Sequence, residues 1–187
     1  MNLSNKLTII RVILVPVMLV FIFCTGIPHN WMWAFVVFAV ASFTDWLDGH
    51  LARKNGWITN FGKFLDPLAD KILVISALVS FIQFDLAHPI AVIIIISRDL
   101  MVSGLRLVAS TQSGRVIAAN WWGKIKTGSQ MAVIMAVMFF ADFAEKGGWT
   151  DTLCLWSNIG VWIVAALTVI SGVVYMYQNA DVLKDAG

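Results

Sequence analysis

Four aspartates close together in the sequence have the clearest capacity for chemistry. Asp45 and Asp48 are three residues apart and Asp66 and Asp70 are four apart, so on helices each pair would share one face. Two such helices joined by a short link would direct all four carboxylates to one point. Uncompensated carboxylates are costly among apolar residues, so a strongly positive partner is required. Because the pairs offer only oxygen ligands, the candidates are hard divalent cations such as Mg²⁺ or Mn²⁺.

Basic residues near the aspartates leave an alternative open. Intramembrane ion pairs would also compensate the carboxylates, with the partners Arg53, Lys63 and Lys71. Ion pairing gives no reason for the small residues of the same stretch, which are Gly49, Ala52 and Gly62. Small residues let a ligand or a metal-bound phosphate approach the backbone, and they also allow close helix packing. We therefore favour a metal site and keep both roles for the small residues.

The elements that must position these side chains are apolar helices. The sequence is 59% hydrophobic and only 13% charged, whereas soluble domains average about 25% charged residues. Six apolar runs have the length that a membrane helix needs, about 20 residues, and turn-rich links separate them. The runs cover about residues 7–25, 31–52, 61–84, 88–110, 122–142 and 152–178.

We therefore expect an all-α polytopic membrane protein. Residues 1–187 should form a single domain with six transmembrane helices, and residues 1–11 should add a short N-terminal interfacial helix. The net charge of +2 is too small to indicate a nucleic-acid-binding protein. Cys24 and Cys154 should lie near the outer ends of their helices. A disulfide between them is conceivable, but we favour two unpaired thiols.

The distribution of basic residues predicts the orientation. Of the 13 Lys and Arg residues, only Lys146 falls on the side of the membrane opposite both termini. The others belong to the side of the termini or to the nearer half of a span. Because basic residues collect on the cytoplasmic side, we expect both termini and the aspartates to face the cytoplasm from the cell (inner) membrane.

The aspartates belong to a longer pattern, D-x2-D-G-x2-A-R-x8-G-x3-D-x3-D, which is matched at every fixed position between Asp45 and Asp70. This pattern resembles the signature of the CDP-alcohol phosphotransferases, which are integral membrane enzymes of phospholipid synthesis. Three further segments extend the resemblance over nearly the full length: 5–11, 97–106 and 123–127. They indicate the members that use glycerol 3-phosphate. Ser4 and Asp99 stand where the family often has Pro and Glu, which weakens only the assignment of the acceptor.

The resemblance implies transfer of the phosphatidyl group from CDP-diacylglycerol to the 1-hydroxyl of glycerol 3-phosphate, with release of CMP. Two divalent cations, Mg²⁺ or Mn²⁺, would be held by Asp45, Asp48, Asp66 and Asp70. In this arrangement Asp45 and Asp66 bridge the cations, and Asp70 is also the general base. The residues implied for CDP-diacylglycerol are Asn5, Gly49, Ala52, Arg53, Thr59 and Gly62. The family also suggests a homodimer.

A second cluster is basic. Arg98 is expected near the middle of the membrane, Arg106 lies two helical turns further along the same face, and Lys124 and Lys126 open the next helix. Purely topological charge is one explanation, but Arg98 is too deep for it. A buried basic cluster beside a metal-bound pyrophosphate is what a second phosphate-bearing substrate needs. We assign Arg98, Arg106, Lys124 and Lys126 to glycerol 3-phosphate, with Asp99 orienting or partly neutralising them.

Three other functions remain open at this stage. A related transferase would use another acceptor, such as inositol phosphate, serine or phosphatidylglycerol. A membrane prenyltransferase also uses Asp-rich motifs and Mg²⁺, but places its two motifs far apart in a longer bundle. A transporter or ion channel with an acidic site gives no reason for the spacing of the signature, and the six runs show no inverted repeat.

Overall fold

The computed structural model describes the backbone of residues 3–55, 60–112 and 121–178, and the side chains of residues 8–44, 69, 71–105 and 121–178. Within this range the chain forms six helices and no strand, which confirms the predicted all-α class. The helices are α1 (Leu3–Phe23), α2 (Asn30–Asn55), α3 (Asn60–Gln83), α4 (Pro89–Gln112), α5 (Trp121–Gly147) and α6 (Thr150–Gln178).

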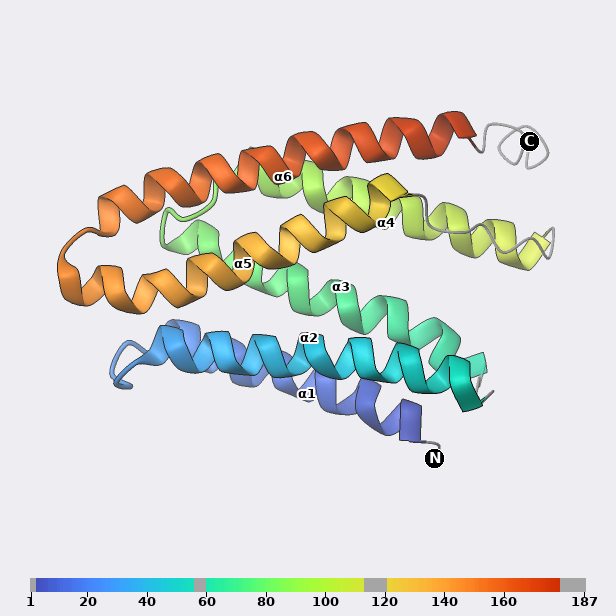
Figure 1. Ribbon diagram of the computed structural model, residues 1–187, viewed down its shortest axis with the longest axis horizontal. Coiled ribbons are helices and arrows are strands. Elements are labelled where there is room, and N and C mark those ends of the chain that lie inside the picture. Colours follow the sequence, from blue (N-terminus) through green and yellow to red (C-terminus); the bar gives the residue numbers. More distant parts are fainter. Residues whose placement is uncertain (1–2, 56–59, 113–120, 179–187) are drawn as a thin grey trace.

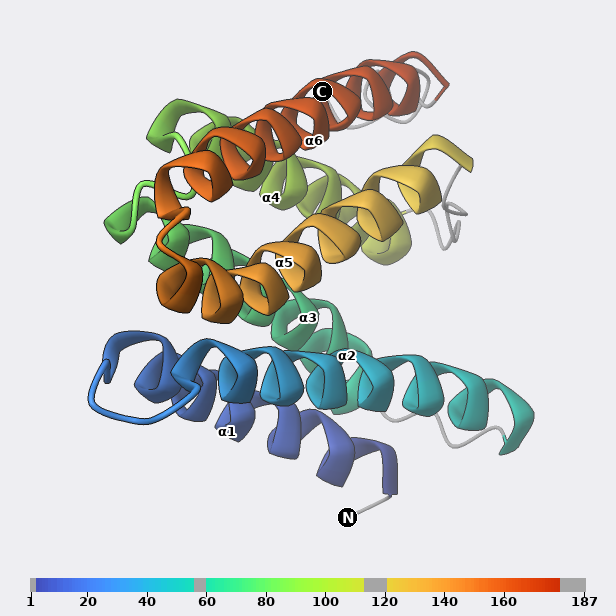
Figure 2. The same ribbon diagram turned by 60° about the vertical axis from the view of Figure 1, so that its left-hand side comes forward.

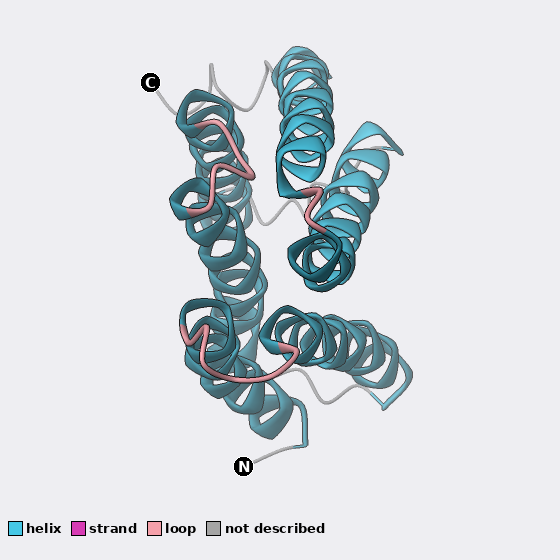
Figure 3. Ribbon diagram, turned by 90° about the vertical axis from the view of Figure 1, so that its left-hand side faces the viewer, coloured by secondary structure: helices cyan, strands magenta, loops and turns pink. Residues whose placement is uncertain are grey.

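Successive helices run in opposite directions, so the bundle has two distinct ends (Figure 1). The start of α1 and the end of α6 lie at one end, together with the end of α2 and the start of α3. We call this the aspartate end, because α2 and α3 carry the four aspartates there. The loops that join α1 to α2, α3 to α4 and α5 to α6 all lie at the opposite end, which faces the viewer in Figure 3.

The helices form one packed core. Helix α1 packs against α2 and α3, α2 packs against α5, and α6 packs against α4 and α5. As Figure 2 shows, α1 and α2 lie on one side of α3 and the other three helices lie on the other side. Fully buried apolar side chains come from every helix: Met18, Phe38, Phe81, Val92, Ile134 and Val161. Burial of such side chains is the main favourable term for packing in water, and close van der Waals contact takes that role within a bilayer.

The outer surface is also apolar, unlike that of a soluble bundle. Exposed large apolar side chains occur on all six helices, and on α6 they include Trp156, Ile163, Ile170 and Val173. Among the described residues, α5 and α6 are long and apolar enough to cross a membrane. The described apolar parts of the first three helices are shorter: Thr8–Phe23, Asn30–Thr44 and Lys71–Gln83.

Local interactions decide where α3 and α5 end. Asp85 and Gly148 have φ angles of 56° and 70°, in the left-handed region that closes many helices. At both ends the next residue donates a backbone hydrogen bond five residues back, from Leu86 N to Phe81 O at 3.0 Å and from Trp149 N to Ala144 O at 3.2 Å. Helix α5 therefore continues to Gly147, five residues beyond the predicted end at residue 142.

Polar contacts tie the loops together at the opposite end. The buried Asp142 carboxylate lies 2.9 Å from His29 Nδ1 and 3.0 Å from Lys146 Nζ. On α6, Ser157 Oγ donates to the Leu86 carbonyl at 2.5 Å, and Asn158 donates to the Asp85 carbonyl at 2.7 Å. These contacts hold α5 against the loop between α1 and α2, and α6 against the loop between α3 and α4. Cys24 and Cys154 are free thiols, as predicted.

Candidate functional site

The four aspartates occupy matching positions on two helices that pack together. Asp45 and Asp48 belong to the last part of α2, and Asp66 and Asp70 to the first part of α3. Asp45 and Asp70 each lie ten residues from the end of their helix at Asn55 or Asn60, or roughly 15 Å at 1.5 Å per residue. The backbone therefore brings both pairs to one end of the bundle at similar depth. Their side chains lie outside the described residues.

The residues implied for CDP-diacylglycerol gather at this same end. Asn5 lies near the start of α1, Gly49, Ala52 and Arg53 lie near the end of α2, and Gly62 lies near the start of α3. Thr59 belongs to the link between α2 and α3 and is outside the described residues, as are the side chains of the other five. Four carboxylates offer only oxygen ligands, which hard divalent cations prefer. The residues present therefore suit the cations that the sequence predicts.

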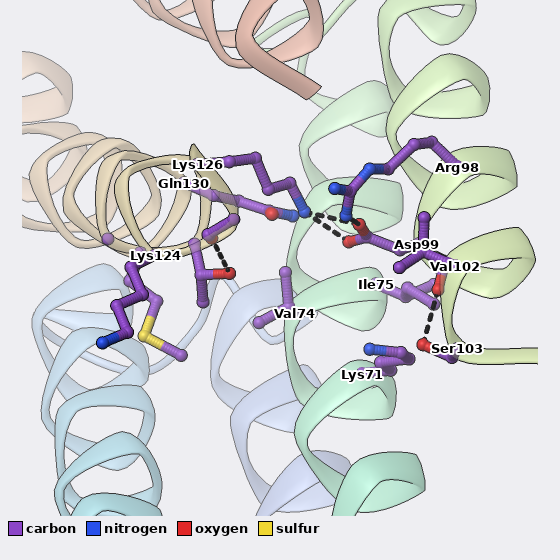
Figure 4. A pocket seen from close by; sticks show the side chains of 14 residues that line it. Lys71, Val74, Ile75, Arg98, Asp99, Val102, Ser103, Lys124, Lys126 and Gln130 are labelled. Atoms are coloured by element: carbon purple, nitrogen blue, oxygen red, sulfur yellow. Dashed lines mark hydrogen bonds and ion pairs between the residues drawn. The ribbon is translucent and has the colours of Figure 1, made fainter. Parts of the chain in front are cut away.

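A pocket with basic walls begins directly after the aspartates on α3. It has a volume of about 440 Å³ and lies between α3, α4 and α5, within the usual range of small-molecule sites, about 300–1,000 Å³. Its charged lining residues are Lys71, Arg98, Asp99, Lys124 and Lys126 (Figure 4). We call it the basic pocket. Since four of these side chains are basic and one is acidic, the pocket favours an anionic ligand.

Asp99 connects two basic side chains across the pocket. Lys126 Nζ on α5 lies 2.6 Å and 2.5 Å from the two carboxylate oxygens of Asp99 on α4. Arg98 Nη1 lies 3.3 Å from Asp99 Oδ1. Figure 4 shows both cations directed toward this carboxylate. The Lys126 side chain is only 3% exposed, and an ammonium group so buried needs a close carboxylate to remain charged.

Arg98 is also held from the far side by α6. Its Nη2 donates a hydrogen bond to Ser171 Oγ, which is fully buried. Asp99 and Ser171 thus take one terminal nitrogen each. The planar guanidinium is fixed in orientation while its side chain still lines the basic pocket.

Three of the four predicted acceptor residues, Arg98, Lys124 and Lys126, line the basic pocket, but only two of them contact Asp99. Arg98 and Lys126 meet at Asp99, as described above. Lys124 is exposed and its Nζ lies 5.9 Å from the centre of the Trp121 ring, directed away from Asp99 in Figure 4. Arg106 lies on α4 two turns after Arg98, with its side chain outside the described residues.

Sequence reasoning did not assign two contributors to the pocket. Lys71 was considered only as an ion-pair partner of the aspartates, although its place after Asp70 puts it at their level on α3. Gln130 lies one turn after Lys126 on α5 and also lines the pocket. A buried glutamine in an apolar helix is a signal that could have found it, because such polar groups need a partner.

Comparison with known proteins gives a consistent result. The sequence model of the family described as CDP-alcohol phosphatidyltransferase matches residues 1–174. A Bacillus subtilis protein is 40% identical over 98% of this chain and 97% of its own length. A Haemophilus influenzae protein is 36% identical over 98% and 96%, and one from Rickettsia felis is 33% identical over 96% and 94%. Each of the three is named CDP-diacylglycerol–glycerol-3-phosphate 3-phosphatidyltransferase.

The buried pair of Asp99 and Lys126 yields a stability prediction. Asp99→Asn should destabilise the protein in detergent, because it leaves the buried Lys126 ammonium without its carboxylate. Lys126→Met should also destabilise it, but by less, because Asp99 keeps its contact with Arg98. The double variant should lose less unfolding free energy than the sum of the two single variants, with a coupling free energy of about 1–3 kcal/mol measured by thermal unfolding. Lys124→Met, two residues away and exposed, is the matched control and should change stability by less than about 0.5 kcal/mol. Additive losses in the double variant would contradict the pairing.

Proposed function

Because the chain belongs to the CDP-alcohol phosphatidyltransferase family, we propose that it transfers a phosphatidyl group from CDP-diacylglycerol to glycerol 3-phosphate, giving phosphatidylglycerophosphate and CMP. The names of the relatives support this acceptor. The observation that carries the proposal is the position of the basic pocket. Lys71 and Val74 line it and follow Asp70 on α3 by one residue and by one turn. A phosphate in this pocket would therefore lie beside the carboxylates that handle the pyrophosphate.

The aspartates suit a metal-dependent displacement. When bound, two divalent cations would neutralise the pyrophosphate of the donor and stabilise the charge that develops during transfer. Asp45, Asp48, Asp66 and Asp70 would hold them. The chain's own task would be to bring these four carboxylates together, and the contact between α2 and α3 supports this proposal.

Asp70 has the best position to act as general base. It is the aspartate next to Lys71, and so the nearest to the basic pocket along α3. Its carboxylate would accept the proton of the acceptor's 1-hydroxyl. The hydroxyl oxygen then forms a bond to the phosphorus of the phosphatidyl group, while the bond from that phosphorus to the oxygen of CMP breaks.

The acceptor phosphate would bind in the basic pocket. Arg98 is the principal ligand in this proposal, because its guanidinium lines the pocket and is held in place from two sides. Lys71 adds a second positive charge at the wall formed by α3. The charge of Lys126 is neutralised by Asp99. Lys126 would therefore help to shape the pocket and would bind phosphate only in competition with the Asp99 carboxylate. Arg106 and Lys124 would complete the positive field at the pocket entrance.

The donor would occupy the aspartate end of α1, α2 and α3. Gly49, Ala52 and Gly62 would let the nucleotide approach the backbone. Arg53 would pair with the diphosphate, and Asn5 and Thr59 would hold the cytidine. The acyl chains would remain in the surrounding lipid, which explains a reaction site placed between apolar helices.

The membrane setting is part of the proposal. Exposed large apolar side chains occur on the described part of every helix, and a water-soluble protein rarely exposes apolar patches of that extent. We propose that all six helices cross the inner membrane as one domain and that both termini face the cytoplasm. A homodimer is proposed from the family alone.

The metal site gives the first functional prediction. Asp45→Asn and Asp66→Asn should each reduce turnover to background, because each would remove a negative ligand from the proposed cation site. The measurement is CMP release at saturating Mg²⁺ or Mn²⁺. Asp85→Asn, at the opposite end of the bundle, is the control and should retain activity. Near-normal rates in either site variant would rule out the two-cation arrangement.

Topology can be tested independently. Single cysteines would replace Lys54, Arg115 or Lys146 in a chain whose Cys24 and Cys154 are changed to alanine. A membrane-impermeant thiol reagent applied to intact cells should label position 146 and leave positions 54 and 115 unlabelled until the cells are opened. Labelling of position 146 only after opening would contradict six membrane crossings.

The acceptor residues can be separated from the donor residues by kinetics. Arg98→Ala should raise the KM for glycerol 3-phosphate or lower kcat/KM for it, by roughly 30-fold to several thousand-fold. That range corresponds to about 2–5 kcal/mol for one lost contact to a desolvated charge. Arg53→Ala should instead weaken the use of CDP-diacylglycerol. Initial rates against each substrate, with the other saturating, decide between them. Equal effects of Arg98→Ala on both substrates would remove the pocket's assignment to the acceptor.

A further inference from the structure

Two residues of α6 that do not line the basic pocket control the arginine that does. We infer that Ser171 and Gly172 are positioning residues, which fix the Arg98 guanidinium where it meets the acceptor phosphate. The inference rests on the proposed function, since it assigns Arg98 to glycerol 3-phosphate. It adds α6 to the elements that determine the affinity for this acceptor.

The hydrogen bond from Arg98 to Ser171 is the first observation. Ser171 is fully buried on α6, and its Oγ accepts from Arg98 Nη2 on α4. The same guanidinium donates through Nη1 to Asp99 Oδ1 at 3.3 Å. Arginine has several rotatable bonds, and a contact at each terminal nitrogen selects one conformation before substrate arrives. Such preorganisation reduces the conformational entropy that the Arg98 side chain loses when a ligand binds.

The close approach of α6 at Gly172 is the second observation, and it is independent of the hydrogen bond. Gly172 is buried, and a Cβ built on it would lie 3.1 Å from Arg98 Cγ and 3.5 Å from Arg98 Nε. Ordinary contacts between carbon atoms are about 3.5–4.0 Å. A methyl group at position 172 would therefore push the Arg98 side chain near its base, and the guanidinium at its tip would move with it.

A purely structural role for Gly172 is the competing explanation. Gly160 provides the matched comparison, because it lies on the same helix and its Cβ would meet Val133 Cγ1 on α5 at 3.3 Å. It lies twelve residues away, or roughly 18 Å along the helix, and contacts no residue of the basic pocket through that Cβ. A methyl group there tests tight packing of α6 without touching Arg98.

The experiment compares Gly172→Ala, Ser171→Ala and Gly160→Ala by steady-state kinetics in detergent. The first two should raise the KM for glycerol 3-phosphate by about 5- to 50-fold, a range expected for misplacing a binding group by less than about 1 Å. The KM for CDP-diacylglycerol should change less than about twofold in both. Gly160→Ala should leave both KM values within about twofold of the unmodified protein.

Combining each change with Arg98→Ala gives the decisive result. If Ser171 and Gly172 act only through Arg98, neither change should raise the KM for glycerol 3-phosphate further once Arg98 is alanine. Additive effects in this background would overturn the inference. The inference would also be overturned if Gly172→Ala and Ser171→Ala behaved like Gly160→Ala while Arg98→Ala raised the KM for glycerol 3-phosphate. In that case the proposed function would still stand.

Failure of the proposed function has a different signature. If Arg98→Ala itself leaves glycerol 3-phosphate kinetics unchanged, the assignment of the pocket fails and this inference fails with it. Thermal unfolding of every variant identifies any that does not fold. If Gly172→Ala does not fold, Ser171→Ala decides the question alone, because removing one hydroxyl group introduces no steric clash.

Discussion

The ion pair between Asp99 and Lys126 joins α4 to α5 and gives the buried Lys126 ammonium the carboxylate that it needs to remain charged. It also places Arg98, which shares the same carboxylate, at the wall of the basic pocket. Asp99 therefore neutralises part of the positive charge in the basic pocket, and the remaining basic side chains leave a net positive charge. Under the proposed function, an entering phosphate would meet an Arg98 side chain that is already held in place by Asp99 and Ser171.

This arrangement needs helices that are fixed at both ends. At the opposite end, Asp142, His29 and Lys146 form one polar cluster, and Ser157 and Asn158 hold the loop between α3 and α4. Lys71, the residue after Asp70 on α3, lines the same pocket as Arg98, so the basic pocket begins next to the predicted metal residues along α3. In the proposed function, α2 and α3 carry the predicted metal residues and α4 carries Arg98, while α5 and α6 contribute Lys126 and Ser171, which contact Asp99 and Arg98.

Sequence reasoning located the six long helices well because length and hydropathy determine where an apolar helix begins and ends. The separate interfacial helix predicted within residues 1–11 is wrong, since α1 runs without a break from Leu3 to Phe23. It placed the end of α5 too early, since the Asp142–Lys146 pair and the left-handed Gly148 extend and close that helix locally. It could not distinguish Lys124 from Lys126. Two residues apart on a helix, they point in nearly opposite directions, and only the folded arrangement, in which Lys126 on α5 faces Asp99 on α4, shows which one meets the carboxylate. The roles of the four aspartates stay predictions.

The identity of the acceptor is the central claim, and competition among acceptors tests it most directly. Purified protein would be given CDP-diacylglycerol and Mg²⁺ or Mn²⁺ with glycerol 3-phosphate, inositol phosphate, serine or phosphatidylglycerol, and CMP release would be measured. The account predicts metal-dependent CMP release with glycerol 3-phosphate, no inhibition by the other three alcohols at equal concentration, and background rates with each of them alone. Faster release with any of the three than with glycerol 3-phosphate would contradict it.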